Sequence, residues 1–124
     1  MNTSDLDNAL NTASSTITLG KILSKEVSEY VLLSQKKGAS IPIYFNEDKE
    51  ITISNSSVRK LLSETINGNL SNIHLAYICD CLTLGEKVTF ENEEIEDLIF
   101  ALADPEINGG YKNLEELQNR IDNL

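Results

Sequence analysis

Apolar residues recur at helical spacing along most of the chain. Stripes of this kind predict helices over residues 20–37, between residues 54 and 68, and over residues 72–84, 92–103 and 113–124. Serine or asparagine stands at or just before the start of four of these segments, and a glycine or an Asp-Pro pair stands at or just after the end of four, as residues that cap and end helices do. The chain is therefore expected to be rich in helices with defined ends.

Three shorter stretches alternate between apolar and polar residues, as half-buried strands do. Residues 41–45 and 50–54 flank a polar turn at residues 46–49 and predict a β-hairpin, in which Pro42 marks an edge or the start of a strand. Residues 87–90 predict a third strand. We therefore expect an α+β fold with four to five helices around a small, mainly antiparallel three-stranded sheet.

A length of 124 residues, 40% of them hydrophobic, predicts a single globular domain over residues 1–124. Residues 1–15 are mostly polar, and the spacing of Leu6, Leu10 and Ala13 favours only a short or frayed helix there. No apolar run reaches the ~18–20 residues that span a bilayer, and the first residues lack the basic and apolar regions of a secretory leader. The expected location is the cytoplasm.

Negative charge is concentrated in the C-terminal part of the chain. Residues 1–75 hold seven Lys or Arg against eight Asp or Glu, whereas residues 76–124 hold three against twelve. A field of one sign repels nucleic acid and anionic lipid, and it speeds encounter with cationic partners. The charge therefore predicts a basic partner, or serves only to keep the chain in solution, and it argues against nucleic-acid and membrane partners.

One carboxylate is predicted to lie in the core. The segment 72–84 is apolar around its whole circumference, which is typical of a central buried helix, and it contains Asp80. A buried carboxylate needs hydrogen bonds or a cation, or its pKa rises. Asp80 is therefore either an acid tuned for chemistry or, as we favour, a structural group bonded to a backbone or to a tyrosine hydroxyl.

Two cysteines on the same predicted helix raise the question of metal or redox chemistry. Cys79 and Cys81 stand two residues apart, so on a helix their side chains point ~200° from each other, which suits neither a shared metal nor a disulfide. His74 would make only a third ligand, whereas structural zinc sites close with four. We interpret both cysteines as small core residues, and expect no metal and no cofactor.

Catalytic signatures are missing from the sequence. There is one histidine, and there is no nucleophile elbow and no glycine-rich phosphate loop. Carboxylates remain the only candidate acid–base groups, and a run of them is more often a solvated surface than a site. We therefore predict a protein that is not an enzyme, with a carboxylate hydrolase as the least favoured alternative.

The acidic helix presents an aromatic residue among its acids. Its apolar stripe consists of Ile95, Leu98, Ile99 and Leu102. Phe100 falls off this stripe, on the side of the carboxylates, where an aromatic ring resembles the anchor of an interface; alternatively the helix packs on two sides and Phe100 is core. The predicted partner-binding residues are Glu91, Glu93, Glu94, Glu96, Asp97, Phe100, Asp104 and Glu106.

Residues 88–109, which read VTFENEEIEDLIFALADPEING, resemble immunity proteins of bacterial contact-dependent growth inhibition and related polymorphic toxin systems. The likeness is strongest at the acidic helix and at the turn over residues 104–109. It implies a small acidic protein of the bacterial cytosol that binds and neutralises a cognate toxin domain, often a nuclease. Because a nuclease needs a basic cleft for phosphates, an acidic protein would fit that cleft.

The expectation that combines these observations is an immunity protein that occludes the active site of a basic toxin domain. The alternative is an acidic adaptor, or a module that mimics DNA and binds another basic protein. Sequence alone leaves the oligomeric state open.

Overall fold

The structure is a computed structural model that describes residues 1–34, 43–105 and 110–124. These residues form seven helices, more than the four to five that the sequence predicts, and a sheet of two strands. In chain order the elements are α1 (Thr3–Asn11), α2 (Thr16–Ile22), α3 (Ser24–Ser34), β1 (Ile51–Ile53), α4 (Asn55–Ile66), α5 (Asn72–Leu84), β2 (Val88–Phe90), α6 (Glu93–Leu102) and α7 (Leu114–Asp122).

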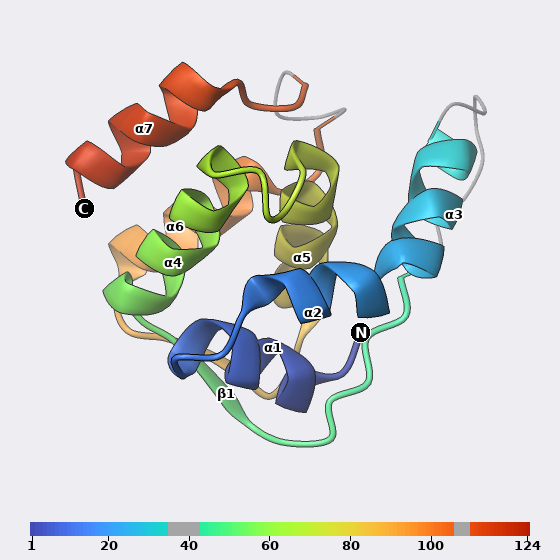
Figure 1. Ribbon diagram of the computed structural model, residues 1–124. Coiled ribbons are helices and arrows are strands. Elements are labelled where there is room, and N and C mark those ends of the chain that lie inside the picture. The colour runs from blue at the N-terminus through green and yellow to red at the C-terminus, as the bar shows by residue number, and fades with distance from the viewer. Residues whose placement is uncertain (35–42, 106–109) are drawn as a thin grey trace.

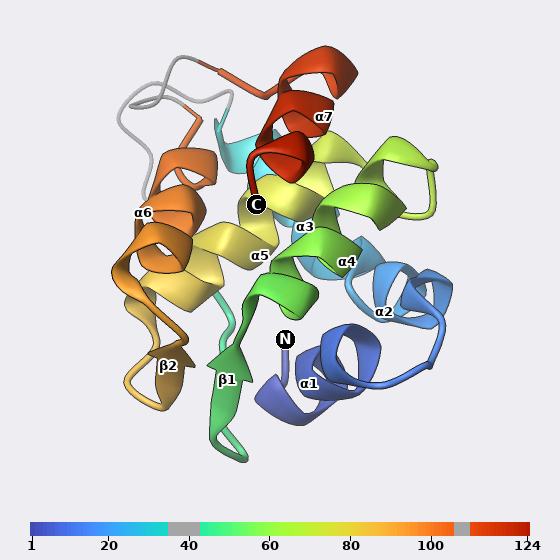
Figure 2. The ribbon, with the colours of Figure 1, turned by 90° about the vertical axis from the view of Figure 1, so that its left-hand side faces the viewer.

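Helix α5 is the centre of the molecule (Figures 1 and 2). Helices α3, α4 and α6 pack around it, α7 lies on α4, and α1 and α2 close the side on which β1 lies. The predicted central position of α5 is confirmed, because seven of its thirteen residues are buried and Tyr77, Ile78, Cys79 and Cys81 are fully so. Removing this much apolar surface from water is the main force that holds the helices together.

Helices α4 to α7 begin where their sequences predict. Ser54 caps α4 and Ser71 caps α5, each accepting a hydrogen bond from the backbone N–H three residues later. Asn92 and Asn113 do the same for α6 and α7. Gly68, with φ of 85°, follows α4 in the left-handed conformation that glycine adopts without strain.

The prediction of one helix over residues 20–37 is wrong in its first half. Ser15 accepts a hydrogen bond from the N–H of Ile17 and starts α2 at Thr16, before the predicted start. The chain then bends at Leu23, and α3 begins at Ser24, whose hydroxyl donates to the carbonyl of Lys21 at 2.9 Å. Residues 35–37 lie outside the described part of the chain.

The predicted three-stranded, mainly antiparallel sheet is also wrong. In the described residues β1 pairs with β2 alone, and the pair is parallel, with Ile51 opposite Val88 and Ile53 opposite Phe90. Parallel neighbours need a long crossover, and here α4 and α5 supply it.

The predicted hairpin partner of β1 does not pair with it. Residues 43–45 form no strand, and residues 41–42 lie outside the described ranges. The backbone of Asn46 bonds the N-terminal segment instead, because its N–H donates to the carbonyl of Met1 and its carbonyl accepts from the N–H of Thr3, at 2.8 and 3.0 Å. The hydrogen bonds that a hairpin would need are therefore directed to another part of the chain.

The N-terminal helix is part of the core. Leu6 and Leu10 of α1 are buried against the rest of the molecule, as is Met1. Asp48 caps the helix from a distant loop, since its carboxylate accepts hydrogen bonds from the N–H and hydroxyl of Ser4 and the hydroxyl of Thr3. Among the described residues no helix has the length and apolar character that a membrane crossing requires.

Candidate functional site

Helix α6 is favoured at its start by a capping residue and by charges that match the helix dipole. The side chain of Asn92 accepts a hydrogen bond from the N–H of Ile95 at 3.0 Å. Glu93, Glu94 and Glu96 stand in the first turn, where negative charge stabilises a helix. The acids that make the segment a candidate site therefore also favour the helix that displays them.

The two faces of α6 differ as the helical wheel predicts. Its inward stripe is buried and consists of Ile95, Leu98, Ile99 and Leu102. Phe100 is 48% exposed on the opposite face, so the alternative in which its ring belongs to the core is not what the structure shows. At ~100° per residue, Glu93, Glu96 and Asp97 lie closest around Phe100, and all three are exposed. We call these four residues the α6 outer face.

The other predicted binding residues lie outside the α6 outer face. Glu94 is exposed on α6, but the helical wheel places it toward the flank of the outer face. Glu91 precedes the helix, and its carboxylate accepts a hydrogen bond from the N–H of Asn55 at 2.7 Å, where it caps α4. Asp104 is half-buried beyond the end of α6, and Glu106 lies outside the described residues.

Asp80 fixes the C-terminal end of α6. Its Oδ1 accepts a hydrogen bond from the backbone N–H of Asp104 at 2.6 Å, and its Oδ2 accepts one from the hydroxyl of Tyr30 at 2.7 Å. Burial raises the pKa of Asp80, and these two bonds partly offset that rise. The partners are a tyrosine hydroxyl and a backbone, which is the structural role that sequence analysis favoured over a catalytic one.

A second polar contact ties α5 to α3. The hydroxyl of Tyr77 donates to Oε1 of Glu26 at 2.6 Å, and the Tyr77 ring meets the ring of Tyr30 edge to face, with centroids 5.5 Å apart. Burial raises the pKa of both tyrosines, so the hydroxyls remain protonated donors. No sequence motif predicts the contact between Tyr30 and Tyr77, and the one available signal is that both tyrosines fall on apolar helix faces.

The cysteines and the histidine are separated by their packing. Cys79 and Cys81 are fully buried free thiols, and burial raises the pKa of both, that of Cys81 to about 12. His74 is bound elsewhere, with Nδ1 2.7 Å from the hydroxyl of Ser71 and Nε2 3.3 Å from the carbonyl of Gly20. Across the described ranges no three His, Cys, Asp or Glu side chains come together as metal ligands would.

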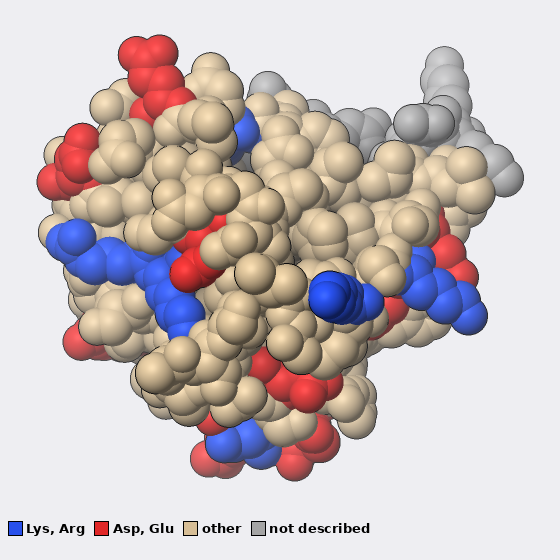
Figure 3. All heavy atoms as spheres, viewed as in Figure 1, with Lys and Arg blue, Asp and Glu red and all other residues tan. Residues whose placement is uncertain are grey.

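The face of the molecule opposite α6 differs in charge. Figure 3 shows that face, on which acidic and basic side chains are interspersed within wide neutral areas. Helix α6 lies at the back of the same view and on the left flank of Figure 2. The outer face of α6 carries three carboxylates around Phe100 without a basic residue of its own helix. The α6 outer face therefore carries charge of one sign, whereas the face in Figure 3 carries both.

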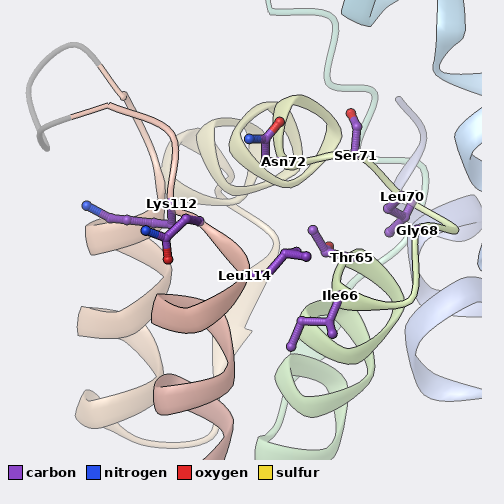
Figure 4. A pocket seen from close by; sticks show the side chains of 9 residues that line it. Thr65, Ile66, Gly68, Leu70, Ser71, Asn72, Lys112 and Leu114 are labelled. Carbon is purple, nitrogen blue, oxygen red and sulfur yellow. The ribbon is translucent and has the colours of Figure 1, made fainter.

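A hollow of about 520 Å³ lies between the end of α4, the start of α5 and the start of α7. Leu114, 57% exposed, points toward Thr65 and Ile66 across it, and Lys112 stands at its rim (Figure 4). None of its described lining residues belongs to the predicted binding set. Lys112 is the one ionisable side chain among the described residues that line the hollow, so these residues hold no acid–base pair.

Comparison of the chain with models of protein families, with curated proteins and with solved structures finds no match. The α6 outer face and the resemblance of residues 88–109 are therefore the two features of this chain that bear on its function. Neither depends on the position of any residue in a relative.

Proposed function

We propose that this protein is an immunity protein of the bacterial cytosol, which binds a cognate basic toxin domain and blocks its active site. The observation that carries the proposal is the exposed ring of Phe100 among Glu93, Glu96 and Asp97 on one helix face. An aromatic anchor within a charged rim is the arrangement found at the centre of many protein interfaces.

The carboxylates would act first, at a distance. The chain has a formal net charge of −10, and twelve of its twenty acids lie in residues 76–124. Opposite charges on two proteins accelerate encounter, and this effect falls as ionic strength rises. A nuclease domain with a basic cleft for phosphates is the kind of partner that such a field attracts.

Phe100 would act after encounter, by filling an apolar pocket of the partner. The helix that carries it is fixed at its start by Asn92 and at its end by the bond from Asp104 to Asp80. Because the opposite stripe of α6 is buried, the ring projects from a rigid support. Binding then costs little conformational entropy, which favours affinity.

The direct test has a genetic and a biochemical part. The gene beside this one should encode a large secreted protein with a basic C-terminal domain, and co-expression with this chain should remove the toxicity of that domain. A purified complex that still cleaves nucleic acid at the free domain's rate would overturn the proposal. Binding to an unrelated DNA-binding factor would favour the adaptor, and turnover that a single carboxylate substitution abolishes would favour a hydrolase.

A further inference from the structure

Strand β2 has one edge that pairs with β1 and one that does not. The N–H of Ile51 donates to the carbonyl of Lys87 at 3.0 Å, and the N–H of Glu91 donates to the carbonyl of Ile53 at 2.9 Å. With this parallel register Lys87, Thr89 and Glu91 turn their backbone groups toward β1. Val88 and Phe90, the alternate residues, turn their N–H and C=O groups the other way.

The outward backbone groups of Val88 and Phe90 have no partner among the described residues. The opposite edge of the sheet packs against α1, and the side chain of Asn11 on that helix donates to the carbonyl of Thr52 at 3.0 Å. In Figure 2, β2 lies on the outer side of β1, on the flank where α6 stands above it. Among the described residues the β2 edge of the sheet is therefore open, and it lies beside helix α6.

The acidic residues around the β2 edge favour a basic segment as its binding partner. Glu86 precedes β2, and Glu93 and Glu94 follow it, all three exposed, with Lys87 as the one opposing charge between residues 86 and 94. A second copy of the chain would bring a like-charged edge against this one, at a cost in repulsion. A segment rich in lysine or arginine would gain attraction instead.

We propose that the open edge of β2 receives an extended basic segment of the partner, which adds a third strand to the sheet. Its backbone would donate to the carbonyls of Val88 and Phe90 and accept from their N–H groups. This inference rests on the proposed function, since the segment belongs to the same toxin domain that the α6 outer face binds. The β2 edge would bind the partner's backbone by hydrogen bonds, whereas the α6 outer face would bind its basic side chains.

Amide hydrogen exchange tests whether a strand is added at the edge of β2. The exchange rate of each amide is measured by NMR with and without the basic domain encoded beside this gene. The amides of Val88 and Phe90 should exchange at least about tenfold more slowly in the complex. Those of Thr89 and Glu91, already bonded to β1, serve as internal controls and should change little. This alternation separates an added strand from simple covering of the surface, which would slow exchange without a period of two.

Val88→Pro removes one outward N–H without removing a bond between β1 and β2. It should raise Kd roughly three- to tenfold, whereas the matched Val88→Ala, which keeps the N–H, should leave Kd within about twofold. Tight binding with unchanged exchange at Val88 and Phe90 would overturn the edge proposal and leave the immunity role standing. Absence of any binding would contradict both the edge proposal and the immunity role. If exchange at Val88 and Phe90 slows in the free protein as its concentration rises, the edge binds a second copy of the chain, and the proposal is wrong.

Discussion

The carboxylate of Asp80 holds the backbone of Asp104, 24 residues later in the chain, at an N–H to Oδ1 distance of 2.6 Å. Asp104 has a φ of 43°, a left-handed conformation that few residues other than glycine adopt, and it directly precedes Pro105. The bond therefore stabilises the strained turn that ends α6. It connects the central helix to the end of the helix that carries the candidate interface.

Replacing Asp80 with Ala should lower the free energy of unfolding by about 1–3 kcal/mol, because the Tyr30 hydroxyl and the Asp104 N–H both lose their acceptor. Asp80→Asn keeps an acceptor oxygen for one of them and should cost less. Urea denaturation of the three proteins measures the difference. An alanine variant as stable as the parent would show that the bond to Asp104 contributes nothing.

A charge in the centre of α5 should unfold the protein. Leu75 and Ile78 are buried, and an unpaired carboxylate there costs several kcal/mol against a total stability of about 5–15 kcal/mol. Leu75→Asp and Ile78→Asp should therefore lose the cooperative melting transition seen by circular dichroism. Leu84→Asp, on the same helix at a residue that is 65% exposed, is the control and should melt close to the parent. If the two core variants melted normally, α5 would not be the centre of the fold.

The starts of α4 to α7 were predictable from sequence because their signals are local. Ser54, Ser71, Asn92 and Asn113 each bond a backbone N–H three residues away, so the signal and its partner occur within one window. The sheet was not predictable in this way. Alternation at residues 51–53 indicates a strand but does not identify its partner, which lies 37 residues later at Val88 and is brought there by the packing of α4 and α5.

In the candidate site, too, local features were predictable from sequence and contacts between distant residues were not. The exposure of Phe100 follows from helix geometry, which a wheel captures without tertiary information. Helix geometry does not predict the roles of Glu91 and Asp104, because their hydrogen-bond partners Asn55 and Asp80 belong to α4 and α5. For Asp80, the sequence indicated that a buried carboxylate needs partners, and only the packing of α3 against α5 identifies Tyr30 as one of them.

Acid should release the cap that Asp48 places on α1. Hydrogen bonds from the Ser4 side chain and backbone, and then from Thr3, lower the pKa of Asp48 from 3.8 to about 2. The folded pKa thus lies below the unfolded one, so this contribution to stability is fully present above about pH 4 and is lost as pH falls through about 2.

Asp48→Asn should therefore reduce the loss of stability between about pH 4 and pH 2. Glu50→Gln removes a neighbouring exposed carboxylate that makes no hydrogen bond among the described residues, and it serves as the control. Thermal melts across this range measure the effect. Equal slopes for the Asp48→Asn variant and the parent would contradict the capping role.

Phe100→Ala should weaken partner binding by about 1–3 kcal/mol, mainly through faster dissociation, because an anchor in a pocket acts after encounter. Since the ring is half-exposed, the melting temperature should change little. Leu32→Ala removes a side chain that is 61% exposed on α3 and should leave both rate constants unchanged. If Phe100→Ala instead melts early with a normal dissociation rate, the ring serves the fold and not the interface.

The most direct test of the α6 outer face is surface plasmon resonance against the neighbouring gene's basic domain at two salt concentrations. The triple variant Glu93→Ser, Glu96→Ser, Asp97→Ser is compared with Glu115→Ser, Glu116→Ser, Asp122→Ser, which removes the same charge from exposed positions of α7. The α6 variant should associate more slowly and lose most of its salt dependence, while the α7 variant should stay much closer to the parent. Equal association rates for the two triple variants at both salt concentrations would contradict an interface at α6.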